Sequence, residues 1–385
     1  MTIEISSLTR PGQSTTLTRA SAQWRDRPAD ERFLSIEEWR AAAHRFKDRS
    51  SEEVIDLSRL RLGYDKDEIL VNDAKMSNWA FSQLSSRLKA PASYLRTLPP
   101  DLALLNLKHG LAANVVEGEQ ALLLNGPSAV SAFTGVNYPR IWNAEIADWI
   151  ADLQAAQPFW TFPTAFKTAS GSKENAWGEQ KELPVAFMSD RDCFVFLCDY
   201  EHGIEVPGAS TVLSRGFWVE NNEVGAGSVK ITMFLFDFVC SNVLVWGARN
   251  VVEVKVAHRG RARERVLFED SEARQAIVEY ANASDYEDTL RIHRAQKTLV
   301  ADTPNETVEV LYSKRLPGLT KSLLTDAVNV AVRTERYQFG EGPTSVWAVI
   351  NGITEVSQRL AYADARIEVD RSAARIFDAM VPLES

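Results

Sequence analysis

Two clusters of polar residues in this sequence have side chains suited to chemistry. The first lies in the stretch "WVENNEVGAGSVKITMFLFDFVCSN", from Trp218 to Asn242. It holds the carboxylates Glu220 and Glu223, with two asparagines between them. Carboxylate and amide oxygens are ligands for hard cations such as magnesium. Glu220, Asn222 and Glu223 are therefore candidate metal ligands, and the two carboxylates are candidates for acid/base chemistry.

The same stretch is also typical of a structural corner. In an extended chain, alternate residues point to opposite faces, which would separate the two carboxylates unless a turn regrouped them. Gly225 and Gly227 permit a positive φ, as a tight turn between two strands requires. We expect a short helix over residues 234–242, ended by Asn242, because asparagine tolerates a left-handed helix end. On this interpretation the corner reverses the chain so that the apolar half can be buried.

The second cluster is "KVAHRGRARERV", in which residues 255–265 hold five Lys or Arg and one Glu. In an extended hairpin, alternate arginines would share one face, at a spacing close to that of phosphates along a single strand. This pattern indicates a nucleic-acid-binding surface made of Lys255, His258, Arg259, Arg261, Arg263 and Arg265. The alternative is a solvated edge strand protected by its charges. Three tryptophans are candidates for stacking on bases: Trp177, Trp218 and Trp246.

Length and composition narrow the class of protein. The chain has 385 residues, 45% apolar and 25% charged, which is typical of a soluble globular protein. The net charge of −9 excludes a protein coated in basic residues but not a local basic stripe. Three cysteines suggest reduced thiols in a cytoplasmic protein. We find no signal peptide, no apolar run of membrane length, no P-loop and no dinucleotide-binding glycine pattern.

Apolar periodicity and turn residues predict the elements that position these clusters. Helices are predicted at 35–46, 77–88, 100–111, 143–156, 271–282, 321–335 and 345–362, with a short one after Pro91. Strands are predicted in a hairpin around Asn125-Gly126-Pro127, at 193–200, in a hairpin at 217–222 and 228–234, and at 251–258. The fold class is therefore α+β, with a central, mainly antiparallel sheet and helices at both ends of the chain. We expect a mobile tail (1–33), a helical N-terminal subdomain (34–115) and an α+β main domain (116–385) with an exposed loop (168–182).

Four segments together resemble the phage/plasmid-like protein family, catalogued as domain of unknown function 932. They are "FSQLSSRLKAPASYLRTLPPDL", "DRDCFVFLCDYE", "GFWVENNEVGAGSVKITMFLFDFVCSN" and the tail "SVWAVINGITEVSQ" with "DARIEVDRSAARIF", spread over residues 75 to 380. The chain departs from the family pattern at Val243, where glycine is usual, and at Ser131 and Asn137, where arginines are usual. The resemblance implies a setting in mobile DNA and implies no specific activity.

These observations leave three functions open. The first is a cytoplasmic, DNA-binding accessory protein of mobile elements, preferring single-stranded to duplex DNA and working as a homo-oligomer without a cofactor. The second is a magnesium-dependent enzyme with an acidic site at Glu220 and Glu223. The third is a scaffold that binds other proteins. The family setting and the arginine-rich segment favour the first over an enzyme, and they assign no catalytic residue beyond the acid/base candidates of the second.

Overall fold

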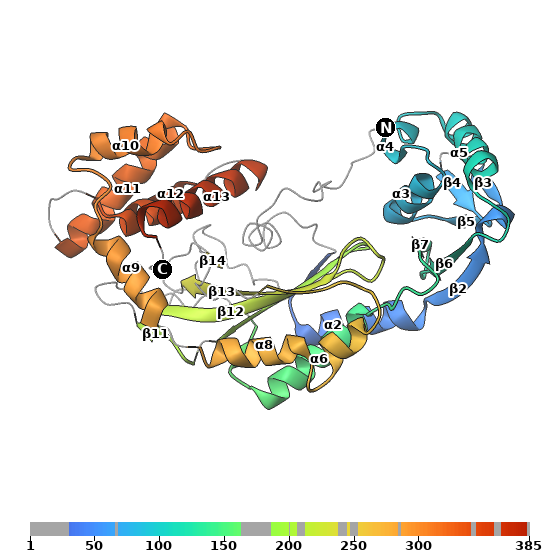
Figure 1. The fold of residues 1–385 in the computed structure, drawn as a ribbon, viewed down its shortest axis with the longest axis horizontal. Coiled ribbons are helices and arrows are strands. Elements are labelled where there is room, and N and C mark those ends of the chain that lie inside the picture. The colour runs from blue at the N-terminus through green and yellow to red at the C-terminus, as the bar shows by residue number, and fades with distance from the viewer. Residues whose placement is uncertain are drawn as a thin grey trace.

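The computed structural model describes residues 31–65, 68–162, 186–199, 201–205, 212–237, 245–246, 253–283, 286–339, 344–357 and 363–382. Within these residues the chain is α+β, as the sequence predicts, with antiparallel sheets. Figure 1 shows three parts in a row: an N-terminal lobe, a central sheet lying on helices, and a group of C-terminal helices. The predictions for residues 1–30, for the loop at 168–182 and for the helix end at Asn242 lie outside the described residues.

The central sheet is built on the order β1-β9-β10-β12-β13-β14, with β8, β11 and β15 paired to β10, β12 and β13. Its strands are β1 (Arg32–Phe33), β8 (Trp160–Thr161), β9 (Ala186–Met188), β10 (Cys193–Asp199), β11 (Ile204–Glu205), β12 (Val212–Asn221), β13 (Val229–Asp237), β14 (Val245–Trp246) and β15 (Glu253–Val256). Every residue of β10 is buried, which explains its unbroken apolar run. Together β12 and β13 form the predicted hairpin.

Two sequence predictions are wrong at the ends of this sheet. The short helix expected from residue 234 is a strand as far as Asp237, because β13 pairs with β12 from Lys230 to Asp237. A short apolar run fits either state, and here pairing with the neighbouring strand decides it. Arg32 and Phe33, which we placed in the N-terminal tail, form β1 and pair with β9.

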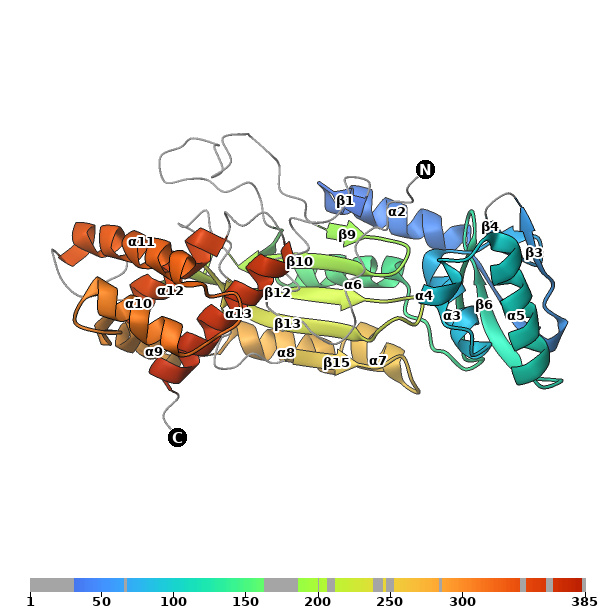
Figure 2. The same ribbon diagram turned by 90° about the horizontal axis from the view of Figure 1, so that it is seen from above.

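A layer of helices lies under one face of the central sheet (Figures 1 and 2). They are α2 (Ile36–Asp48), α6 (Asn143–Ala156), α7 (Ala262–Leu267) and α8 (Glu272–Ala281). Trp39, Ile150 and Phe217 pack in the core between these helices and the strands. Ser35 caps α2 at the predicted start of this helix, since its hydroxyl accepts a hydrogen bond from the Glu38 N–H at 3.1 Å. Asn143 does not cap α6 but is its first helical residue.

The C-terminal helices are α9 (Tyr286–Lys297), α10 (Pro304–Ser313), α11 (Lys321–Phe339), α12 (Val346–Ser357) and α13 (Ala363–Met380). The central one is α12, which is buried on nearly every side. At Gly352 a Cβ atom would overlap the carbonyl oxygen of Ala327, so only glycine lets α11 and α12 pack this closely. No helix in the described part of the chain is both long and apolar enough to cross a bilayer.

The N-terminal lobe contains two three-stranded sheets and three helices. Its elements are β2 (Ser51–Asp56), the 3₁₀ helix η2 (Leu57–Arg59), β3 (Leu62–Asp65), β4 (Glu68–Val71), β5 (Ala74–Lys75), α3 (Asn78–Arg87), α4 (Ala92–Leu95), α5 (Pro100–Asn114), β6 (Gln120–Asn125) and β7 (Val130–Thr134). The starts of α3, α4 and α5 agree with the sequence prediction. The subdomain that we expected to be helical also contains the strands β2 to β5, and β2 pairs with β6 across the boundary that we placed at residue 115.

Candidate functional site

The polar corner, residues 220–227, contains the last two residues of β12 and the turn toward β13, at the end of the sheet nearest the N-terminal lobe (Figure 2). Gly225 has a φ of +79°, as the corner interpretation requires. Gly227 has no positive φ, so the sequence prediction holds for one of the two glycines. The side chain of Asn222 closes the turn by accepting a hydrogen bond from the Ala226 N–H at 2.5 Å.

Side chains of α3 attach the N-terminal lobe to this corner. The carbonyl oxygen of Val224 accepts hydrogen bonds from Trp79 Nε1 at 3.1 Å and from Gln83 Nε2 at 2.8 Å. Beneath these bonds the Val224 side chain packs with Leu124 and Ala132 in a small buried apolar cluster. The corner is therefore a joint between the lobe and the sheet, because its polar backbone and its apolar side chain are both bound by the lobe.

The segment that leads from β7 to α6 holds the neighbouring carbonyls of the corner. Tyr138 Oη donates to the carbonyl oxygen of Asn222 at 3.1 Å, and Arg140 donates to that of Glu223. The Arg140 side chain is almost completely buried and forms an ion pair with Glu52 of β2 at 2.7 Å. Three consecutive carbonyl groups of the corner thus receive side-chain donors from outside the hairpin.

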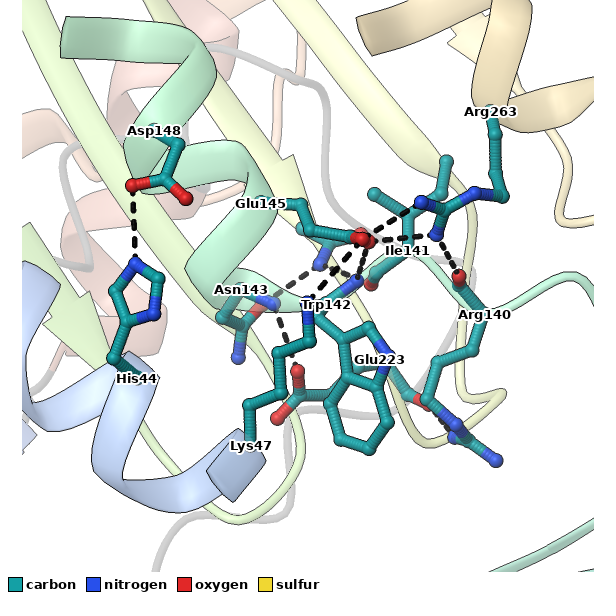
Figure 3. A network of polar contacts seen from close by, with 11 residues as sticks. His44, Lys47, Arg140, Ile141, Trp142, Asn143, Glu145, Asp148, Glu223 and Arg263 are labelled. Atoms are coloured by element: carbon teal, nitrogen blue, oxygen red, sulfur yellow. Dashed lines mark hydrogen bonds and ion pairs between the residues drawn. The ribbon is translucent and has the colours of Figure 1, made fainter. Parts of the chain in front are cut away.

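Glu223 is the most unusual titratable group of the corner. Its side chain is buried, and Oε2 accepts a hydrogen bond from the Asn143 N–H at 2.8 Å, at the start of α6 (Figure 3). Burial raises the pKa of Glu223 to about 7, against the opposing effects of the Asn143 hydrogen bond and the Arg140 charge. The nearby carboxylate of Glu145 raises this pKa further. Glu223 therefore exchanges its proton close to neutral pH.

The three residues predicted as metal ligands point to different partners. Glu220 forms an ion pair with Lys230 across the hairpin at 3.3 Å, Asn222 closes the turn, and Glu223 faces the start of α6. Among the described residues, no group of three or more His, Cys, Asp or Glu side chains is arranged to hold a metal ion. The geometry of the corner thus gives no support to the magnesium site.

Glu145, in the first turn of α6, is a second centre of polar contacts (Figure 3). Its carboxylate accepts two hydrogen bonds of 2.7 Å from the guanidinium of Arg263, one from the Trp142 N–H at 3.0 Å and one from Lys47 at 3.4 Å. Burial alone would raise the pKa of Glu145, but these contacts outweigh it and hold the pKa below its ordinary value. Glu145 consequently ties together α2, α6 and α7.

The basic segment, residues 255–265, does not form the extended hairpin that its alternating arginines suggested. The strand β15 ends at Val256, and α7 begins at Ala262. Gly260 in the intervening turn has a φ of +53°, which ends the extended conformation. The buried side chains of Ala262 and Val266 then anchor a helix whose period of 3.6 distributes the arginines around its axis.

The arginines of this segment have different roles. Arg263 faces α6 and pairs with Glu145, while Arg265 pairs with Glu272 at 2.6 Å. Arg261 pairs with Glu264 at 2.9 Å, yet its side chain is 84% exposed. The remaining two cations, Lys255 and Arg259, are exposed, and neither makes an ion pair within the described part of the chain. The structure thus leaves Lys255, Arg259 and Arg261 available to an anionic partner.

His258 and Trp218, two further candidates, are buried. The His258 ring lies 5.1 Å from that of Tyr138, and burial lowers its pKa to about 4. It is therefore neutral at physiological pH and unsuited to binding phosphate. Trp218 is fully buried on β12, which removes it as a surface platform for bases. Trp177 and the side chain of Trp246 lie outside the described residues.

Sequence reasoning missed Tyr138, Arg140 and Glu145, which complete the joint. They lie in "NYPRIWNAE", between a hairpin and a helix, where no periodic pattern distinguishes a contact residue. The only available signal was Glu145, since an acidic residue in the first turn of a helix bonds its free N–H groups.

The family comparison covers the corner and the basic segment. Residues 200–379 match the model of a domain of unknown function, DUF932. This chain contains a DUF932 domain. The match is narrower than the resemblance that we expected over residues 75–380, and it leaves α3, Arg140 and Glu145 outside the DUF932 domain. In comparisons with curated proteins and with solved structures, no match to the chain was found.

Proposed function

We propose that this protein binds nucleic acid, with single-stranded DNA as its expected ligand, as a cytoplasmic accessory protein of mobile elements. One observation carries the proposal. Lys255 and Arg259 are exposed without an ion pair among the described residues, and Arg261 follows on the same turn with a side chain that is 84% exposed. Cations of this kind bind phosphates and release counterions from the nucleic acid. The DUF932 match is compatible with this proposal and does not itself supply a function.

The proposed contact is smaller than the sequence pattern suggested. Arg263 and Arg265 are neutralised by Glu145 and Glu272, and binding phosphate through them would first break those ion pairs. Three cations remain, and each contributes about 0.7 to the slope of log affinity against log salt concentration for a single strand. We therefore expect weak binding with a slope of about −2, well short of the value for a fully extended row of arginines.

The experiment measures the fluorescence anisotropy of labelled single-stranded DNA, duplex DNA and RNA at 50 and 200 mM salt. The test variant is K255A/R259A/R261A. The control variant is R45A/R49A/K314A, which removes three exposed positive charges elsewhere on the molecule. We expect the test variant to lose at least tenfold in affinity and most of its salt dependence, and the control to retain both. If both variants lose affinity equally, the loss is caused by the change in net charge, and the assignment of the binding surface to Lys255, Arg259 and Arg261 is overturned.

A second candidate function is proton transfer by Glu223, which narrows the enzyme alternative to one residue. It is supported by the burial of this carboxyl and by its pKa of about 7, a value suited to a general acid or base at neutral pH. Glu220 is not part of this candidate, since it pairs with Lys230. The variant E223Q separates the two functions, because it removes the titrating group and leaves Lys255, Arg259 and Arg261 intact. Unchanged nucleic-acid binding by E223Q is the result expected from the first proposal.

A further inference from the structure

The helix α5 is apolar on two opposite sides. Its inner side, which includes Leu104 and Leu107, packs in the core of the N-terminal lobe. On its outer side Leu102 and Leu105 are 45% and 64% exposed, and Val116, just beyond the helix end, is 68% exposed. Figure 2 shows α5 lying along the surface of the lobe at the end of the molecule opposite the C-terminal helices. A surface helix normally has a polar outer side, so this pattern needs an explanation.

The exposed apolar residues form a line along the helix. Leu102, Leu105 and Ala113 are exposed on one side of the helix, at the spacing of three and eight residues that aligns side chains, and Val116 extends this stripe; the polar ring of His109 lies between Leu105 and Ala113. Singly scattered exposed leucines are common on protein surfaces, whereas apolar residues aligned on one face of a helix, here interrupted by one polar ring, favour an interaction site. The stripe belongs to neither the corner nor the basic segment, so the inference goes beyond the proposed function and does not rest on it.

We propose that a second copy of this chain covers the stripe, with the two α5 helices packed antiparallel across a two-fold axis beside Leu105. Charge complementarity carries this choice of occupant. Asp101 and Lys108 flank the stripe on the same side, seven residues apart; both are exposed, and neither makes an ion pair within the described part of the chain. A two-fold axis halfway between them places Asp101 of each copy opposite Lys108 of the other. In antiparallel helix pairs, residues on the same flank face each other, which makes both ion pairs possible at once.

The size of this interface sets the expected strength. The 15 residues of α5 form a helix about 22 Å long. An interface made of one such helix from each copy belongs to the smallest class of specific interfaces, which bury less than about 1,200 Å² in total. We therefore expect a reversible dimer with a dissociation constant on the order of 10 μM, corresponding to about 7 kcal/mol.

The test measures the molar mass of the full chain by sedimentation equilibrium, from about 1 μM to about 200 μM, concentrations that bracket the expected dissociation constant. We expect wild type to change from monomer to dimer over this range, and L105E to raise the dissociation constant at least tenfold. Because Leu105 is exposed, L105E should leave the melting temperature of the dilute protein unchanged. The matched control is V278E on α8, which places the same charge at another exposed helical position and should dimerise like wild type. A wild type that stays monomeric throughout, or a dimer indifferent to L105E, overturns the proposal.

A charge exchange tests the antiparallel register. D101K alone places a lysine opposite Lys108 at both of the symmetric contacts. This repulsion should raise the dissociation constant severalfold. D101K/K108D restores opposite charges at both contacts and should return the dissociation constant to within about twofold of wild type, because the same two ion pairs are formed with their charges exchanged. Failure of the second change to rescue the first would contradict the register and, with it, the proposed mode of association.

Discussion

Glu223 and Asn143 are 80 positions apart in the chain, yet the carboxylate of Glu223 accepts a hydrogen bond from the backbone N–H of Asn143 at 2.8 Å. This contact joins the β12–β13 corner to the start of α6, where a helix has free N–H groups and a favourable field for an anion. Burial works against the same anion and raises the pKa of Glu223 to about 7. The corner is therefore a structural joint whose central group titrates in the physiological range.

The first prediction concerns the pH dependence of stability. The folded pKa of Glu223 is raised from about 4.5 to about 7, so the folded state holds this proton more tightly than the unfolded state does. The resulting stabilisation is fully present below about pH 4.5 and is lost as pH rises through about 7. The variant E223Q removes this pH-dependent contribution to stability, because glutamine does not titrate. Relative to E223Q, the free energy of unfolding of wild type should fall by on the order of 2–3 kcal/mol between pH 4.5 and 7.5.

Urea denaturation of both proteins at half-unit pH intervals measures this difference. The absolute stability of E223Q does not enter the comparison, because the prediction concerns only the change in the difference with pH. A difference that is constant from pH 4.5 to 7.5 would show that Glu223 has an ordinary pKa in the folded protein, and the second candidate function would lose its support.

The second prediction concerns His258, whose titration should change stability with pH in the direction opposite to that of Glu223. The pKa of His258 is lowered by burial from about 6.5 to about 4, so the unfolded state binds this proton more tightly. The stability associated with neutral His258 is complete above about pH 6.5 and is lost as pH falls through about 4. H258F keeps the ring beside Tyr138 and removes the titration. The variant should gain stability relative to wild type as pH falls from 6.5 to 4, and guanidinium denaturation curves at these pH values measure the gain.

The titrations of Glu223 and His258 change the free energy of unfolding in opposite directions between about pH 4.5 and 6.5. In wild type the two changes should largely cancel. The free energy of unfolding of wild type should therefore change little with pH in this range. In E223Q it should rise with pH, and in H258F it should fall with pH. If H258F and wild type lose stability in parallel on acidification, His258 is not the group responsible.

The sequence was sufficient wherever the local pattern and the tertiary environment agree. The apolar run of β10 predicts a buried strand because both faces of that strand are covered, and Ser35 and Ser77 predict helix starts because a hydroxyl satisfies a free N–H there. The corner was predicted as a turn from Gly225, whose positive φ is a purely local requirement. All these features depend on residues close together in the chain.

Contacts between distant segments were beyond the reach of the same reasoning. The alternation of arginines at 259–265 is equally compatible with a strand and with a short helix, and only the packing of Ala262 and Val266 decides between them. The role of Arg140 depends on β2 and the corner, 88 and 83 positions away in the chain. Short strands such as β3 to β5 carry too few residues for a period to be recognised.

The third prediction separates two neighbouring arginines that the sequence treated alike. Arg263 makes two 2.7 Å hydrogen bonds to Glu145 and one of 2.9 Å to the Arg140 carbonyl, whereas Arg261 is largely exposed. R263A should lower the free energy of unfolding by about 1–2 kcal/mol, a value reduced by the partial exposure of the pair. R261A should leave stability unchanged within about 0.5 kcal/mol and weaken nucleic-acid binding. Thermal melts and anisotropy titrations of both variants measure stability and nucleic-acid binding. A loss of stability in R261A, with weaker binding only in R263A, would contradict our account of α7.

The fourth prediction tests the corner itself through Gly225. Alanine there must adopt a φ near +79°, and its Cβ would lie 2.9 Å from the Cγ2 methyl of Thr134 in β7. Gly118 is a matched control, because its φ is +82° but nothing lies within 4 Å of the position that an alanine Cβ would occupy. G118A should cost about 1 kcal/mol for the backbone strain alone, and G225A about 2–3 kcal/mol because steric overlap is added.

The excess cost of G225A over G118A is expected to come from one methyl group. T134S removes that methyl and keeps the hydroxyl, which donates to the Leu122 carbonyl at 3.3 Å. Adding T134S to G225A should therefore recover about 1 kcal/mol, although T134S alone should be slightly destabilising because it removes a buried methyl group. A double-mutant cycle of denaturation free energies measures this coupling. Additive effects of the two changes would mean that Thr134 of β7 does not press on the corner, and the joint between lobe and sheet would then rest on its hydrogen bonds and on the packing of Val224 with Leu124 and Ala132.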